Sequence, residues 1–497
     1  MSNSPTKVLV KGNVDGSRDG SLLSCSSKHL YRSSVLVLLG LTVVLLSPIA
    51  LLKRDIVLTV VNEYVQVSAS AKEVAAGAVG TPAVERYQEL SSLAAVNRAI
   101  GGEANPMIRG EQDCLPVDEE STMDGYFSVP LLETLGTWTS NKVIDVNRSI
   151  SIVTQLSIDR LTMLENQCRS WDDVLVAVVY VPLEASVDSP GLSKSSRKAP
   201  KATRQRPFGI RSSLGDIERS IDAFFSMMEA TENTCALQIQ LVGQSIEDTR
   251  TSPYPINALR NRAIALAQTP LVFVLDVDFV AAPRLGLPGE GYRSAEVYDG
   301  LLKRAKNKGA IVVPAFELVD GHQMEPYIGE HVVKRLVQDG KDMLRQAYKQ
   351  EIVGAFNARD FEAGHGPTNT SKWIRLRDPS AMYKVNYQAS YEPFLILARD
   401  TVPHADERFV GYGANKLVFV QTLNASGFTF HVHGSGYAIH VPHAKTRAAN
   451  IFIAHRKGST MDPMDILRGM VSRALEDGSW KPVVRGCQVG ATSDDAS

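Results

Sequence analysis

Two hydrophobic periods alternate along the chain from residue 149 onward. Nearly uninterrupted apolar runs, typical of strands buried on both faces, occupy residues 150–156, 174–181, 237–242, 271–275 and 310–313. Between these runs apolar residues recur with helical spacing, which predicts helices over 158–168, 217–228, 257–267 and 295–306. Strands that alternate with helices predict an α/β fold with a doubly wound, mostly parallel sheet. Ligands of such sheets bind beyond the carboxyl ends of the strands.

A different pattern precedes this region. Residues 35–52 form an uncharged apolar run, long enough to span a membrane and too long and too far from the N-terminus for a signal peptide. Five basic residues precede it and two follow it closely, so the positive-inside rule predicts a type II protein. The expected order is a cytosolic tail (1–34), a transmembrane anchor (35–52), a lumenal stem (53–148), the main domain (149–480) and a C-terminal tail (481–497).

Composition narrows the function classes. The formal net charge is −1, so electrostatics gives no reason to expect a nucleic-acid partner. Residues 184–213 form a polar, basic insert with too few apolar side chains to fold alone, and we expect a disordered surface loop rather than a polyanion site. Beyond the anchor lie four cysteines, which allow up to two disulfides in three pairings, and three glycosylation sequons that begin at Asn147, Asn369 and Asn424.

Asp276 and Asp278 follow the apolar run at 271–275. Residues two apart on a strand point to the same face, so both carboxylates are expected to aim at one point. Two neighbouring buried carboxylates are costly unless a cation neutralises them. Carboxylate oxygens suit Mn²⁺ or Mg²⁺, which would hold the diphosphate of a nucleotide. A structural pair that accepts backbone hydrogen bonds is the alternative.

Two further segments carry candidate site residues. Tyr254-Pro-Ile-Asn-Ala-Leu-Arg-Asn-Arg opens the predicted helix with Asn257 as N-cap, and a helix N-terminus with arginines favours an anion. The candidates for nucleotide binding are therefore Asn257, Arg260 and Asn261, while Arg262 fits a surface role equally well. Late in the chain, Gly436-Tyr-Ala-Ile-His-Val-Pro-His predicts a short strand that presents His440 or, less directly, His443 as a metal ligand.

Seven segments in this order resemble family 49 glycosyltransferases, which include LARGE-type glucuronyltransferase domains. They are SIVTQLSIDRLTMLENQCRSW, YPINALRNRA, VFVLDVDFV, GHGPTNTSKW, NYQASYEPFLILARD, DERFVGYGANK and YAIHVPHA. The resemblance covers roughly residues 149–443. It implies a GT-A fold with a C-terminal α+β extension, a UDP-sugar donor, Mn²⁺ dependence and inversion at the anomeric carbon. By this resemblance Asp276, Asp278 and His440 bind the metal, and the enzyme is a Golgi membrane protein with a glycan or glycoprotein acceptor.

An inverting transfer also requires a general base for the acceptor hydroxyl. Many inverting GT-A enzymes place an acid where this chain reads Gly413-Ala-Asn-Lys, and neither Ala414 nor Asn415 can serve. The candidates are Asp406, which we favour, and Glu392. The structural alternatives are that Asp406 caps a helix near residue 411 and that Glu392 pairs with an arginine.

Other functions remain open at this point. A catalytically silent carbohydrate-binding or scaffold protein on the same fold is the principal alternative, and a metal-dependent phosphoesterase would need more metal ligands than the sequence offers. The donor sugar is open as well. Glucuronic acid, which the resemblance favours, would need a cationic partner for its carboxylate, such as Arg375, Arg377 or Lys384.

Overall fold

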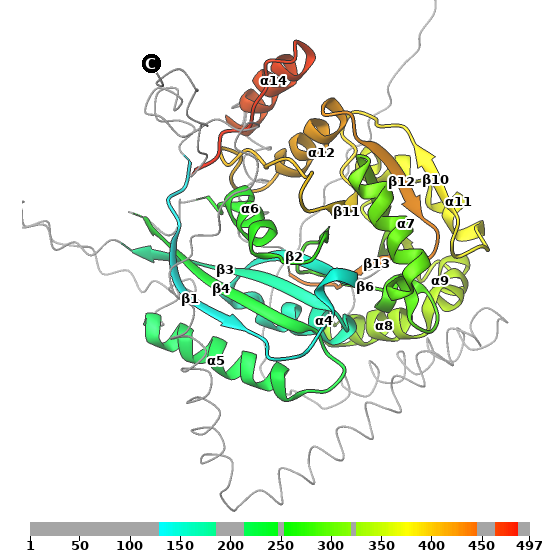
Figure 1. Ribbon diagram of the computed structural model, residues 1–497, viewed down its shortest axis with the longest axis horizontal. Helices are drawn as coiled ribbons and strands as arrows, with labels where there is room; N and C mark the ends of the chain where they lie inside the picture. The colour runs from blue at the N-terminus through cyan, green and yellow to red at the C-terminus, as the bar shows by residue number, and fades with distance from the viewer. Residues whose placement is uncertain (1–128, 185–212, 247–252, 320–324, 445–462, 486–497) are drawn as a thin grey trace, which may run out of the picture. The chain divides into compact units, whose positions relative to one another are not determined.

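The structure is a computed structural model that describes residues 129–184, 213–246, 253–319, 325–444 and 463–485 (Figure 1). All of the described residues belong to a single compact unit. Among these residues no helix combines the length and the apolar character that a membrane span requires. The expected anchor at 35–52, the basic insert between 185 and 212, Cys114 and Cys487 lie outside the described residues.

A nine-stranded sheet forms the centre of this unit. Its order is β1 (Glu133–Thr139), β4 (Ala236–Ile246), β3 (Val174–Glu184), β2 (Ile150–Ser157), β5 (Leu271–Val274), β11 (Phe394–Ala398), β7 (Gly309–Val313), β12 (Thr429–His433) and β10 (Met382–Val385). The run β4–β3–β2–β5 is parallel, but β11 lies antiparallel between β5 and β7. Both edge strands are antiparallel too. The α/β class is confirmed, whereas the sheet is mixed rather than mostly parallel.

A second, four-stranded sheet carries the late strands of the chain. Its order is β6 (Phe279–Ala281), β13 (Ala438–His440), β8 (Ala315–Leu318) and β9 (Val353–Ala355). β6 follows the two aspartates directly, and it pairs antiparallel with β13, which ends at His440. This pairing brings two segments about 160 residues apart to one place, with Phe279 opposite His440.

Helices cover both faces of the large sheet (Figure 1). On β3, Leu175, Ala177 and Val179 face one core while Val176 and Val178 face the other, as the two-residue period of a strand requires. The first face is covered by α4 (Leu161–Ser170), α5 (Leu214–Ala230) and α7 (Ala295–Lys306). The second core holds side chains of α6 (Ile256–Leu266), α8 (Pro326–Gln338), α9 (Gly340–Lys349), α11 (Thr370–Arg375) and α12 (Asn415–Ala425).

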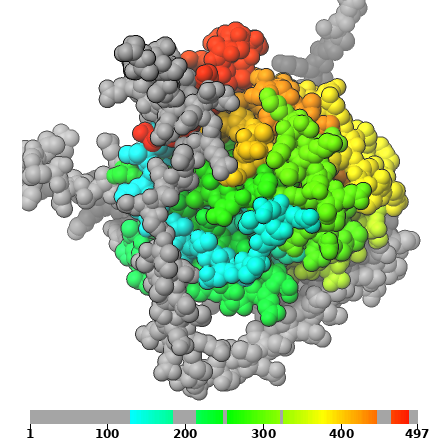
Figure 2. Space-filling model, viewed as in Figure 1, coloured from blue at the N-terminus to red at the C-terminus, as the bar shows by residue number. Residues whose placement is uncertain are grey.

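Both ends of the described region depart from the expected boundaries. β1 lies in the range expected for the stem, yet it pairs with β4 and places Trp138 in the core. At the other end α14 (Pro463–Glu476) packs on α12, with which it is seen side by side in Figure 2. Val483 and Val484 are also buried. The folded domain therefore starts before residue 149 and continues into the expected tail.

One disulfide, Cys168–Cys235, lies in the described region and links the end of α4 to the start of β4. The sequence left three pairings open, and the structure selects this one for the two described cysteines. The bond closes a loop with a sequence separation of 67 residues. Its main effect is to restrict the unfolded chain.

Replacing Cys235 by serine is expected to lower the free energy of unfolding by about 4 kcal/mol, the loop-closure value for a bridge of this span. Urea unfolding of the oxidised wild type and the variant measures the difference. Reductant should lower the stability of the wild type toward that of the variant and leave the variant unchanged. Equal stability of the two proteins under oxidising conditions would contradict this assignment.

Candidate functional site

The acidic pair lies in a turn between the two sheets. β5 ends at Val274, and β6 begins at Phe279, so Asp276 and Asp278 stand in the connecting segment rather than on a strand. The buried Gln167 of α4 fixes this turn, because its amide donates to the carbonyl oxygens of Asp276 (3.2 Å) and Phe279 (3.1 Å). Because β5 is one of the parallel strands, the turn that follows it lies at their carboxyl end, where ligands bind in such sheets.

The two carboxylates face different partners. The Lys416 ammonium lies 2.8 Å from Asp276 Oδ2. Asp278 Oδ2 instead lies 3.0 Å from His443 Nε2 and 3.4 Å from Arg160 Nη1. The expectation that both aspartates aim at one point assumed an extended strand, and the chain has already left the strand at this position.

Two histidines complete the site around Asp278. The backbone N–H of Val441 donates to the Asp278 carbonyl (2.8 Å), which fixes the end of β13 beside the turn. The ligand atoms of Asp278, His440 and His443 all lie within 4.8 Å of one another, and the two Nε2 atoms are 3.3 Å apart. One carboxylate and two imidazoles form a donor set that fits Mn²⁺, with positions left for the oxygens of a ligand. Asp276 lies outside this cluster, and His443, the less favoured candidate, lies inside it.

The charges of this cluster suit a cation. Burial alone raises the pKa of Asp278, but the hydrogen bond with His443 and the nearby His440 and Arg160 outweigh it and hold the pKa below its ordinary value. Burial lowers the pKa of His440 to about 4, against the attraction of Asp278. An ionised carboxylate beside a neutral imidazole is the state that metal binding requires.

Aromatic rings enclose the cluster on its inner side. The rings of Phe279 and Phe356 each lie 5.2 Å from the His440 ring. Phe394 lies 4.4 Å from Phe279 and supports the Lys416 ammonium at 3.9 Å from its ring centre. This apolar wall holds the imidazole in place and limits access of water from behind.

Glu392, one of the two candidate bases, belongs to the same neighbourhood. Burial raises the pKa of Glu392, and the nearby Asp276 raises it further, while Lys416 and Arg260 oppose this. No ion pair in the described part of the chain holds its carboxylate, so the expected structural alternative, a salt bridge to an arginine, is not observed there. A half-buried carboxyl group with a raised pKa beside an acidic turn has the properties of a general base.

Asp406, the favoured candidate, has a structural role instead. Its carboxylate accepts from Arg408 Nη2 (2.7 Å) and the Val483 N–H (3.4 Å), and only 1% of its side chain is exposed. Its carbonyl accepts from Asn257. The expected helix near residue 411 begins at Asn415, so Asp406 does not cap it. These contacts tie the segment to its surroundings and leave the side chain little freedom to meet a substrate.

The expected nucleotide-binding residues hold the fold together. α6 begins at Ile256 after Pro255, so Asn257 lies inside the helix and is not its cap. Asn261 exchanges hydrogen bonds of 2.8 Å with the backbone of Ala405. The fully buried Arg260 guanidinium donates to Asn257 and to Asn415, 3.3 Å away, and lies near Asp276 and Glu392.

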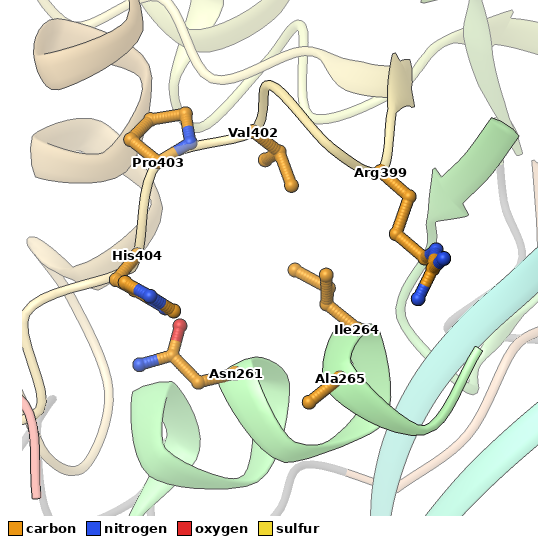
Figure 3. A pocket seen from close by; sticks show the side chains of 7 residues that line it. All are labelled: Asn261, Ile264, Ala265, Arg399, Val402, Pro403 and His404. Carbon is orange, nitrogen blue, oxygen red and sulfur yellow. The ribbon is translucent and has the colours of Figure 1, made fainter. Parts of the chain in front are cut away.

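Figure 3 shows a small cavity beside Asn261, between α6 and the segment that follows β11. Its volume is about 40 Å³, far below the size of a nucleotide site. Arg262 anchors β1, because its guanidinium donates to Thr134 Oγ1 (2.9 Å) and lies 3.4 Å from Gln240 Oε1. Of the four residues only Arg260 therefore adjoins the acidic turn.

Glu407 connects three segments beside Asp406. Its carboxylate accepts from Asn261 Nδ2 (3.0 Å) and from the Arg485 N–H (2.9 Å). Burial raises the pKa of Glu407 to about 7. The folded protein thus keeps this proton between pH 4.5 and 7, where the unfolded chain releases it.

We expect Glu407 to make the protein less stable as the pH rises from about 4.5 through 7. Glu407 contributes roughly 3 kcal/mol to the free energy of unfolding. This contribution is fully present below the pKa of Glu407 in the unfolded chain and is lost above its pKa in the folded protein. Urea unfolding at pH 5 and pH 8 measures it, and Glu407→Gln should reduce the difference between the two values. A wild type and a variant with the same pH dependence would rule this out.

Three residues of this neighbourhood were not identified from the sequence: Gln167, Arg160 and Lys416. Gln167 offered a signal, because it adjoins Cys168 on the apolar face of a predicted helix, where a glutamine is unusual. Lys416 directly follows Asn415, in the segment where an acid was expected. The expected partners of a donor carboxylate are Arg375 on α11, Arg377 after it and Lys384 on β10, and all three are exposed.

Comparison with known proteins agrees with this geometry. The family described as "Glycosyl-transferase for dystroglycan" matches residues 149–459, more than half of the chain. The "Xylosyl- and glucuronyltransferase LARGE1" of Mus musculus is 30% identical over 298 residues, 60% of this chain and 32% of the relative. LARGE2 of Homo sapiens is 30% identical over 295 residues, 59% of this chain and 33% of the relative. The chain thus spans about a third of the length of these relatives. It belongs to the family of glycosyltransferases for dystroglycan.

Proposed function

We propose that this glycosyltransferase moves a sugar from a UDP-sugar to a hydroxyl of a glycan or glycoprotein, with metal dependence and inversion. The observation that carries the proposal is the cluster of Asp278, His440 and His443 at the carboxyl end of the parallel strands. These three side chains would hold Mn²⁺ or Mg²⁺, and the two imidazoles favour Mn²⁺. When bound, the metal neutralises charge that grows on the departing diphosphate.

The residues of the chain supply the remaining chemistry. Glu392, as general base, takes the proton of the acceptor hydroxyl while that oxygen attacks the anomeric carbon from the face opposite to the diphosphate. Arg160 and Gln167 keep the turn and its carboxylates in position. The phenylalanine wall around His440 excludes water that would otherwise hydrolyse the donor.

Glucuronic acid is the donor sugar that we propose, and the similar xylosyl- and glucuronyltransferases support it. A lumenal domain on a Golgi-type anchor at 35–52 completes the proposal. The disulfide Cys168–Cys235 supports an oxidising compartment. The sequon residues Asn147, Asn369 and Asn424 are all exposed, which a glycosylated lumenal domain requires.

A hydrolysis screen tests this proposal. The purified full chain is incubated with a panel of UDP-sugars, with Mn²⁺, with Mg²⁺ and with chelator, and UDP release is measured. We expect metal-dependent release that is largest for UDP-glucuronate. Metal-independent release would exclude the proposed site, and a different preferred donor would exclude glucuronic acid.

The catalytically silent carbohydrate-binding protein is the alternative function for the same fold. It predicts glycan binding with neither hydrolysis nor transfer across the panel. The membership of the chain in a glycosyltransferase family favours the enzyme, and the cluster of Asp278, His440 and His443, which could hold a metal, supports it.

A further inference from the structure

Lys416 occupies the position at the start of α12 where a general base was sought. Its ammonium donates to Asp276 and rests against the Phe394 ring, and 18% of its side chain is exposed. An ammonium has three N–H donors. Among the described residues it uses one of them, on Asp276, so two remain for a ligand that enters from the solvent side.

Two arginines also lie near the acidic turn, and each differs from Lys416 in its position. Arg260 is fully buried and donates to Asn257 and Asn415. Arg160 lies against Asp278, at 3.4 Å. Arg160 is partly exposed as well (14%), but its Nη1 lies on Asp278, inside the imidazole cluster. Lys416 differs in its place, because its ammonium lies on Asp276, outside that cluster, and against the Phe394 ring.

We propose that Lys416 binds an anionic group of the sugar-nucleotide donor, a role that rests on the proposed function. The different partners of the two aspartates support it. Asp278 contacts the histidines of the cluster, whereas Asp276 forms an ion pair with Lys416 beside that cluster. A diphosphate bound at the cluster would bring its oxygens close to this ammonium. The carboxylate of a uronic acid is the second source of the same chemistry.

Binding measurements distinguish these sources. Isothermal titration with UDP, UDP-glucose and UDP-glucuronate, each with Mn²⁺, compares the full-length wild type with Lys416→Met. We expect the variant to bind roughly 10- to 100-fold more weakly, the range for a hydrogen bond to a charged group. An equal loss for all three ligands identifies the diphosphate as the bound group. A loss confined to UDP-glucuronate identifies its carboxylate.

A readout with Mn²⁺ alone separates ligand binding from a merely structural role. Without nucleotide, Lys416→Met should bind Mn²⁺ at least as tightly as the wild type, because a competing cation beside Asp276 has been removed. A lysine that only holds the turn together predicts the opposite, with Mn²⁺ and UDP affinities falling in parallel. That parallel loss would overturn the proposal, as would a change of less than twofold for all three ligands.

Two further variants complete the design. Lys416→Arg keeps the charge and should retain most of the affinity, and it serves as the test if the methionine variant does not fold. In that case Lys416→Arg is compared with Lys416→Gln, a polar neutral variant. Wild-type affinity of the arginine variant together with weak binding by the glutamine variant supports the proposal. Equal affinity of the arginine and glutamine variants overturns it. Lys303→Met, on the exposed face of α7, is the matched control and should behave as wild type. A wild type that binds none of the ligands would overturn the proposed function together with this role.

Discussion

Replacing Asp278 by asparagine is expected to lower the rate of metal-dependent sugar transfer by at least about 10³-fold. Asp278 is the carboxylate of the proposed metal site, and both His440 and His443 lie against it. The asparagine keeps the size of the side chain but removes the charge that balances a divalent cation. Steady-state transfer to an acceptor, and thermal stabilisation by UDP with Mn²⁺, measure the two consequences.

The matched control is Asp299→Asn, on the exposed face of α7, which should leave both measurements unchanged. A second comparison uses Asp276→Asn. Because Asp276 lies outside the cluster, this variant should bind Mn²⁺ more tightly than Asp278→Asn does. A UDP shift in Asp278→Asn that equals the wild-type shift would show that the metal binds elsewhere.

Replacing Glu392 by glutamine is expected to lower kcat by about 10³-fold with little effect on UDP affinity, because a general base acts on the acceptor and not on the nucleotide. The raised pKa of Glu392 also predicts that the activity of the wild type falls as the pH drops and this carboxylate is protonated. Glutamine has the same shape and cannot accept the proton. Single-turnover transfer measures the loss, and titration with UDP measures binding.

Asp406→Asn distinguishes the two candidate bases. Asp406 pairs with Arg408 and is almost fully buried, so its replacement should lower the unfolding temperature. The activity of the folded fraction should remain close to that of the wild type. If Asp406→Asn stays stable and inactive while Glu392→Gln transfers normally, Asp406 is the base and the assignment here is wrong.

Part of the large sheet was predictable, because several of its strands are apolar runs with flanking turns. β2, β3, β4, β5 and β7 follow the predicted runs within a few residues, as does α7. β6 and β13 have three residues each and are defined by their pairing in the small sheet, β6 with β13 and β13 also with β8. The short strand that ends at His440 was predicted and is observed as β13. β6 carries too few residues for a period to show, and β11 was not assigned although it is apolar.

The candidate site was predictable in part for a related reason. Asp278 and His440 were expected from their place at strand ends, and the structure brings them together with His443. The separate partner of Asp276 could not be foreseen, because Lys416 is 140 residues away along the chain. The choice between Asp406 and Glu392 could not be made from the sequence, since an acid beside an arginine looks the same whether it is catalytic or structural.

The contacts of Arg485 have a practical consequence for shortened forms of the enzyme. Its guanidinium donates to the carbonyl oxygens of Val129 (2.8 Å) and Pro130 (3.2 Å), and its backbone N–H donates to Glu407. The first and last described segments are thus joined by one side chain. A shortened protein made for crystallisation should therefore begin ahead of Val129 and end beyond Arg485. A shorter one would lose the hydrogen bonds between the two segments and would leave the Glu407 carboxyl group without its backbone donor.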